Sequence, residues 1–130
     1  MRAIKFRVWD NKKRKMFDKV LDLSSDTFSE QNYVAIIFGR IAMGGVRYIF
    51  EQFIGLKDKN GKEIYKGDIV KFYNSERAIF EIRYSPEYAA FAPFQDGRDL
   101  FETGYKLTSR RPDFYEVVGN VHENKSLTKP

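Results

Sequence analysis

The chain has 130 residues and a formal net charge of +5, and aromatic side chains make up 16% of it. It has no cysteine and one histidine, which excludes disulfides, thiol chemistry and a Cys/His zinc site. No apolar run approaches the roughly 20 residues of a membrane-spanning helix, and the N-terminus lacks the apolar segment of a signal peptide, so we expect a cytoplasmic protein that does not bind membranes.

The positive charge lies at one end of the chain. Residues 1–15 carry seven Lys or Arg residues and one Asp, a local net charge of +6. The rest of the chain carries 16 basic and 17 acidic residues, a net charge of −1. A protein that binds nucleic acid over its whole surface would show a broader basic excess. Any role in nucleic-acid binding therefore rests on the N-terminal residues.

The N-terminal residues predict a β-hairpin with a basic tip. Apolar residues alternate with charged ones from Ile4 to Val8, a polar stretch covers residues 10–15, and the apolar pattern resumes at Met16. Cations beside an aromatic ring can contact phosphates and stack on a base. The candidate nucleic-acid contacts are Trp9, Lys12, Lys13, Arg14 and Lys15. The alternative interpretation is a solvated turn whose charges serve solubility.

Residues 29–43 fit two structures. Val34, Ile37 and Phe38 follow the spacing of an amphipathic helix. Gly39 would cost such a helix about 1 kcal/mol, and the run from Val34 to Phe38 could equally form a buried strand. We favour one short helix, followed by a strand at residues 46–53.

Asn60-Gly61 is a strong hairpin turn signal. A two-residue loop would place Asp58 opposite Glu63, and like charges directly opposite each other destabilise a hairpin. A three-residue loop, with Gly61 in the left-handed conformation, places Asp58 opposite Lys62 instead. We therefore predict the three-residue loop.

Turns divide the rest of the chain into short strands. The clearest lies at residues 77–84, where alternate residues from Ala78 to Tyr84 are apolar and share one face. Further strands are predicted at residues 69–73, 88–94 and 114–121. The polar tail at residues 123–130 is expected to fray. Short strands at this spacing predict an antiparallel barrel or sandwich.

Three segments of the chain resemble one protein family. They are Ile4–Asp10 with Lys15–Met16, the central stretch Phe53–Phe72, and Glu116–Asn124 with Leu127. Together they resemble the YopX family, which is known mainly from phages, prophages and their bacterial hosts and whose biochemical role is unassigned. Two residues depart from the family's usual pattern, because Val8 stands where alanine is frequent and Ile54 where threonine is usual.

The resemblance implies an all-β protein, with an SH3-like small β-barrel at residues 53–130 and a β-rich N-terminal part at residues 1–52. It supplies no catalytic residue. The recurring positions look structural, because glycine and aspartate favour tight turns. These turn positions are Gly55, Asp58, Asn60, Gly61, Gly67, Asp68 and Gly119.

Two groups of side chains are candidates for catalysis. Asp58, Glu63 and Asp68 could hold a metal or exchange protons, but Asp in such turns ordinarily accepts bonds from its own backbone. His122 could act as a base, but no serine or cysteine nucleophile stands at a recognisable motif. We therefore expect no catalytic residue, no metal, no cofactor and no enzymatic activity.

The surplus of aromatic residues points to contacts between proteins. A domain of this size can hardly bury 12 Phe, 8 Tyr and one Trp, and Tyr48–Phe50 and Tyr88–Phe94 are candidates for sheet edges or subunit contacts. The sequence predicts a non-enzymatic interaction or assembly module that forms homo-oligomers, with a host or phage protein as a further partner. The alternative function is nucleic-acid binding through the basic hairpin.

Overall fold

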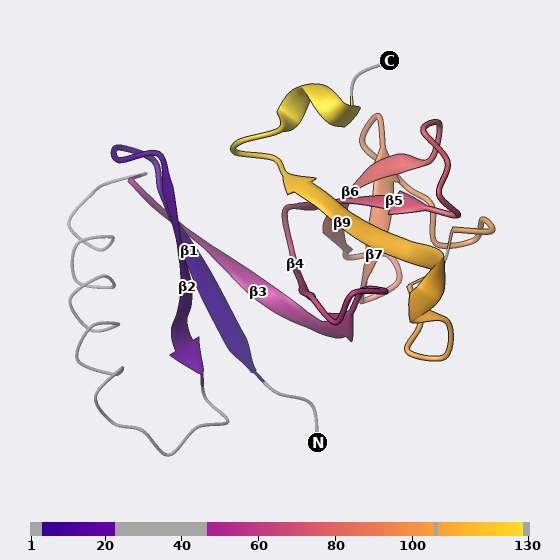
Figure 1. Ribbon diagram of the computed structural model, residues 1–130, viewed down its shortest axis with the longest axis horizontal. Helices are drawn as coiled ribbons and strands as arrows, with labels where there is room; N and C mark the ends of the chain where they lie inside the picture. Colours follow the sequence, from indigo (N-terminus) through magenta and orange to yellow (C-terminus); the bar gives the residue numbers. More distant parts are fainter. Residues whose placement is uncertain (1–3, 23–46, 106, 129–130) are drawn as a thin grey trace. The chain divides into compact units, whose positions relative to one another are not determined.

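The computed structural model describes residues 4–22, 47–105 and 107–128 (Figure 1). The chain divides into two compact units, residues 1–53 and 54–130. The described elements are nine strands and two short 3-10 turns, so the predicted all-β class is confirmed. The short helix favoured for residues 29–43 lies outside the described residues.

The N-terminal unit contains a hairpin of β1 (Lys5–Asp10) and β2 (Lys15–Asp22). β1 lies between β2 and β3 (Tyr48–Lys57) and pairs antiparallel with both. At the closed end of the hairpin Asp10 is paired with Lys15, as the polar stretch predicted. Val8 and Trp9 are fully or almost fully buried. The predicted hairpin is confirmed.

β3 starts two residues later and ends four residues later than the strand predicted at 46–53. Gly55 lies inside it with a φ of 93°, a conformation that glycine adopts without steric cost. A glycine inside a strand commonly marks a bulge, so Gly55 lies within β3 and not in the turn predicted for it.

The hairpin of β3 and β4 (Glu63–Tyr65) has the predicted three-residue loop. The Asp58 N–H donates to the Lys62 carbonyl oxygen at 2.9 Å, which places these two residues opposite each other. The Gly61 N–H donates to the Asp58 carbonyl at 3.0 Å, and Gly61 has a φ of 77°. Charge pairing and the left-handed glycine therefore select the register together.

The C-terminal unit contains a five-stranded antiparallel sheet of order β8-β7-β6-β5-β9. Its strands are β5 (Asp68–Phe72), β6 (Ile79–Ser85), β7 (Ala90–Gln95), β8 (Arg98–Asp99) and β9 (Tyr115–Asn120). The sequence pattern predicted no strand between residues 94 and 114, where β8 lies. A turn at Asp96 and Gly97, which both have positive φ, joins β7 to this two-residue strand, which is too short to show periodicity. An SH3-like closure of this sheet stays a prediction.

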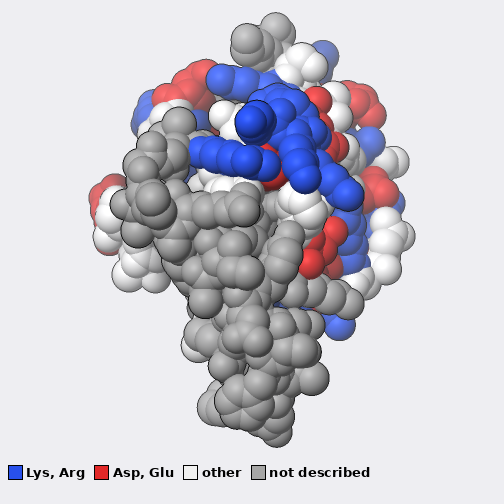
Figure 2. Space-filling model, turned by 90° about the vertical axis from the view of Figure 1, so that its left-hand side faces the viewer, with Lys and Arg blue, Asp and Glu red and all other residues white. Residues whose placement is uncertain are grey.

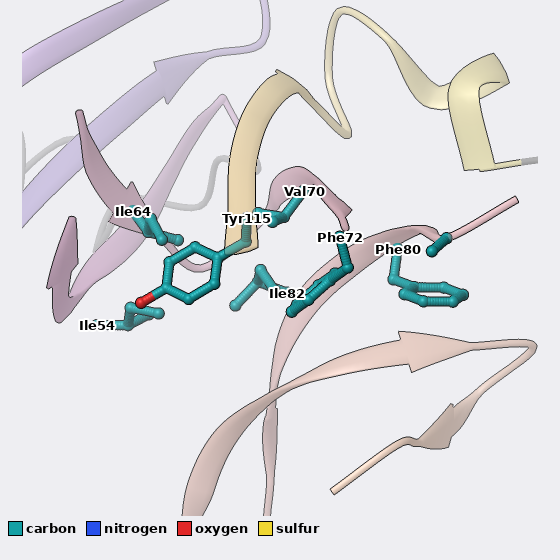
Figure 3. Packing of buried hydrophobic residues seen from close by; sticks show 8 residues of the cluster. Ile54, Ile64, Val70, Phe72, Phe80, Ile82 and Tyr115 are labelled. Atoms are coloured by element: carbon teal, nitrogen blue, oxygen red, sulfur yellow. The ribbon is translucent and has the colours of Figure 1, made fainter. Parts of the chain in front are cut away.

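The buried core of the C-terminal unit gathers side chains from β3, β4, β5, β6 and β9 (Figure 3). Tyr115, from β9, lies among Ile54, Ile64 and Ile82. The cluster comprises Ile54, Ile64, Val70, Phe72, Ala78, Phe80, Ile82 and Tyr115. Burying each large apolar side chain stabilises the fold by roughly 1.5–3 kcal/mol.

The apolar face predicted for residues 77–84 is confirmed except at its end. Ala78, Phe80 and Ile82 are buried, but Tyr84 is 46% exposed. The buried position after Ile82 is Ser85, whose hydroxyl donates to Asp99. The strand therefore changes its inward face near its end, and the Tyr84 ring packs instead against Phe91 on β7.

Two short 3-10 turns flank β9, namely η1 (Pro112–Phe114) and η2 (Lys125–Thr128). The prediction that the tail frays is wrong through Thr128. The Asn124 N–H donates to the Asn120 carbonyl at 2.8 Å, and the Asn120 side-chain oxygen accepts the His122 and Glu123 N–H groups, both at 3.0 Å. Asparagine side chains that bond nearby backbone order a segment without apolar burial.

Gly119 was predicted to be a turn glycine, and the structure gives it a different role. It is not among the glycines with positive φ. A Cβ built there would lie 2.5 Å from the Asn124 Oδ1 atom, which accepts the Asn120 N–H at 3.2 Å. Gly119 is therefore needed for the close approach of Asn124 and not for a left-handed backbone.

Candidate nucleic-acid interface

The residues Lys12, Lys13, Arg14 and Lys15, called the basic tip below, lie at the turn between β1 and β2. One oxygen of Asp10 accepts the backbone N–H groups of Lys12 and Lys13 at 3.0 and 3.1 Å. Aspartate favours such turns because its short side chain reaches the amides that follow it. Arg14 completes the turn with a φ of 54°. The backbone of the basic tip is therefore held in one conformation.

Arg47 holds Asp10 from outside the turn. Its Nε and Nη2 atoms donate to the two carboxylate oxygens of Asp10 at 3.1 and 3.0 Å, a bidentate pair. The Arg47 carbonyl also accepts the Asn11 N–H at 2.6 Å. The hydrogen bonds from Arg47 lower the pKa of Asp10 to about 2, although burial opposes them. Because Arg47 balances this carboxylate, Asp10 does not cancel the charge of the basic tip.

The cations of the basic tip are exposed. Within the part of the chain that the structure describes, the Lys12 and Lys13 ammonium groups have no ion-pair partner. The Arg14 guanidinium lies 5.1 Å from the Trp9 ring centroid and donates to Asn11, and the Lys15 ammonium lies 5.3 Å from the Phe17 ring. Figure 2 shows the left-hand side of the view in Figure 1, and Lys and Arg side chains lie close together on this surface.

The prediction that Trp9 stacks on a base is not compatible with its burial. Trp9 is 1% exposed, so neither face of its ring is open to a ligand. Its Nε1–H donates to the Asn11 side chain at 3.4 Å, and the ring lies beneath Arg14. Trp9 therefore supports the basic tip from below, and the surface offered to a ligand consists of cations.

Sequence reasoning missed Asp10 and Arg47 as parts of this site. Asp10 carried a local signal, since aspartate is frequent just before a turn. Arg47 lies 37 residues away, and no local pattern indicates that it contacts the turn.

The two aspartates among the predicted turn positions accept hydrogen bonds from backbone N–H groups. Asp58, 3% exposed, accepts the N–H groups of Asn60, Lys62 and Val117, each at 2.9 Å. Asp68 accepts the Tyr65 N–H at 2.8 Å. The glycine between Tyr65 and Asp68 has a φ of 91°, and its N–H donates to the Ile82 carbonyl.

The carboxylates that are candidates for catalysis do not form a metal site in the described part of the chain. Among the described residues, no group of three or more His, Cys, Asp or Glu side chains is arranged to hold a metal ion. His122 lies in the turn after β9, where its backbone N–H donates to Asn120. In the described segments, no helix is long and apolar enough to span a bilayer.

A family model described as YopX protein matches residues 5–129 of this chain. The chain belongs to the YopX family. This YopX protein is also similar to a solved structure, the crystal structure of protein EF1440 from Enterococcus faecalis, with 26% sequence identity and a TM-score of 0.61. The match covers 99% of the YopX chain and 100% of EF1440. Among curated proteins, none matches the YopX chain.

Proposed function

We propose that this protein is a non-enzymatic binding module whose basic tip contacts the phosphate backbone of nucleic acid. The observation that carries the proposal is the pair of exposed ammonium groups on Lys12 and Lys13, which have no ion-pair partner in the described part of the chain. They stand on a turn whose backbone is held by Asp10 and Arg47. A ligand that binds there meets a turn whose backbone is already ordered, so the ordering cost is confined to the side chains.

The burial of Trp9 supports contact with phosphates and not with bases. Contacts from Lys and Arg side chains to phosphate oxygens position a nucleic acid without reading its sequence. The affinity should therefore depend strongly on salt and only weakly on base composition.

A non-enzymatic role is supported by the way the carboxylates are used. Asp58 and Asp68 accept backbone N–H groups in turns, so their oxygens hold the fold. Cytoplasmic location, a phage or prophage origin and a phage or host protein partner are further parts of the proposal. They rest on the composition and on the family.

Fluorescence anisotropy with a labelled duplex DNA, repeated between about 50 and 200 mM salt, tests the proposal. Four phosphate contacts predict a slope of log K against log salt of about −3 to −4. Changing Lys12, Lys13, Arg14 and Lys15 to Ser should bring the slope near zero.

The matched control removes the same charge elsewhere. Changing Lys57, Lys62, Arg77 and Lys125 to Ser also removes four exposed cations, and it should leave most of the affinity and slope. Equal losses in both variants would show that only net charge matters, and an unchanged slope in the variant that lacks all four tip cations would refute the proposal.

A further inference from the structure

We propose that the basic tip of one copy docks on an apolar and acidic surface of the C-terminal unit of another copy. This docking face consists of a groove lined by Phe91, Ala92, Pro93, Phe101, Tyr105 and Leu107, together with the carboxylates of Glu87, Asp99 and Glu102. The inference goes beyond nucleic-acid binding and does not depend on it. It turns the expectation of self-association into a contact between named surfaces.

The groove is an apolar depression in the C-terminal unit. It has a volume of about 140 Å³ and lies between β7 and the segment that follows β8. Phe101 is 38% exposed, although it is a large apolar side chain. Exposed aromatic side chains around a depression are typical of surfaces that bind another protein.

An aromatic stack joins the groove to the acidic side chains. The rings of Tyr88 and Phe101 lie parallel, 4.4 Å apart with an angle of 9° between their planes. Phe101 lines the groove, and Tyr88 lines the neighbouring hollow with Glu87, Asp99 and Glu102. The two depressions therefore lie next to each other, with this ring pair between them.

The carboxylates of this face are not neutralised. In the described segments, Glu87 and Glu102 have no ion-pair partner. Glu102 accepts a hydrogen bond from the Tyr88 hydroxyl, and Asp99 accepts those of the Ser85 hydroxyl and the Phe101 N–H. None of these donors is cationic. The lining of the hollow has three carboxylates and one arginine, Arg98, so its net charge is −2.

The basic tip of a second copy complements this face in charge and in chemistry. Its Lys12 and Lys13 side chains are exposed and unpaired within the described residues. A lysine has a long aliphatic stem that can lie on the Tyr88–Phe101 rings while its ammonium group reaches the carboxylates. The opposite charges would guide the encounter and weaken with salt.

The two surfaces lie in different parts of the chain, so each contact joins two different surfaces. Two copies can therefore pair reciprocally through two such contacts, or extend through free tips and faces into larger oligomers. In either case the association of the wild-type protein should depend on its concentration.

Sedimentation velocity on the full chain tests the inference by mixing two variants. The tip variant is Lys12→Ser with Lys13→Ser, and the face variant is Glu87→Gln with Glu102→Gln. All four side chains lie at exposed positions, so both variants should unfold at the wild-type temperature. At about 50 mM salt each variant alone should associate at least about tenfold more weakly than wild type.

The equimolar mixture decides the case. The intact tip of the face variant can dock on the intact face of the tip variant, so the mixture should form 1:1 pairs and nothing larger. Failure of the mixture to pair would overturn the inference, as would a face variant that associates like wild type. A monomeric wild type that binds a synthetic peptide of residues 10–17 through Glu87 and Glu102 would also overturn it, in favour of a basic segment of another protein.

Nucleic-acid binding provides the control. The face variant keeps its basic tip, so its affinity for duplex DNA should equal that of the wild type. Weaker DNA binding by the tip variant, together with 1:1 pairs in the mixture, supports both proposals. Wild-type DNA binding by the tip variant would refute nucleic-acid binding alone, and a mixture that forms no pairs would refute the docking alone.

Discussion

Replacing Asp58 tests how the C-terminal unit is held together. The carboxylate is almost fully buried and accepts three backbone N–H groups, from Asn60 and Lys62 in its own turn and from Val117 in β9. In Asp58→Ala all three donors lose their acceptor. Loss of the hydrogen bond from the half-buried Val117 should cost about 1.5–3 kcal/mol of folding free energy. Loss of each of the two bonds from the exposed turn donors, which water can reach, should cost about 0.5–1 kcal/mol. The expected loss of folding free energy is about 2.5–5 kcal/mol.

Asp58→Asn separates the hydrogen bonds within the turn from the hydrogen bond to β9. An asparagine keeps one oxygen for the turn, but its amide group would face the Val117 N–H, and two donors cannot bond each other. We expect a loss of about 2 kcal/mol, with faster hydrogen exchange at the Val117 amide. Urea denaturation followed by circular dichroism measures the first quantity and amide exchange the second.

The control is Asp113→Asn, because this side chain is 68% exposed and its contact with Arg111 is 4.0 Å long. It should change the stability by less than about 0.5 kcal/mol. If Asp58→Asn also stays within that limit and the Val117 amide exchanges at the wild-type rate, the carboxylate does not hold the hairpin to β9, and the reasoning is wrong.

Three further outcomes follow from the geometry. Folding lowers the pKa of Asp10 from 3.8 to about 2, so the stability contributed by its ionised carboxylate is complete above about pH 4 and is lost as the pH falls toward 2. Arg47→Ala should reduce this acid-induced loss of stability, measured by an acid titration followed by Trp9 fluorescence. Gly119→Ala should cost roughly 1–3 kcal/mol in urea denaturation, and less on an Asn124→Ala background, because the added Cβ meets that side chain; equal costs on both backgrounds would contradict this explanation. Gly61→Ala should cost roughly 1 kcal/mol through backbone strain alone, because open space surrounds the position, and a neutral result would refute that account.

The local parts of the fold were predictable from the sequence. The β1–β2 hairpin follows from alternation over a few residues, and the loop at Lys59–Gly61 follows from which charges would face each other. Both depend on residues close together in the chain. The family also followed from short turn motifs, because these motifs record local backbone conformations.

The parts that depend on distant contacts were not predictable. The alternation that placed Trp9 on a strand could not show that its ring is buried, and Arg47 is brought to the tip by the pairing of β1 with β3. β8 is two residues long and exists only because β7 provides its partner. The ordered tail depends on the hydrogen bond between Asn120 and Asn124. Sequence patterns assign asparagine to loops, so they did not predict this order.

The third N–H group bonded to Asp58 comes from a residue 59 positions later in the chain. During synthesis the first hairpin of the C-terminal unit emerges long before β9 exists. Until then the carboxylate has only its own turn to bond and remains hydrated. Strand β9 therefore completes the earliest turn of this unit, and a ribosome must translate 59 residues beyond Asp58 before that turn reaches its final form. In a chain that stops short of β9, the Asp58 carboxylate would lack both the Val117 N–H and the strand that buries it.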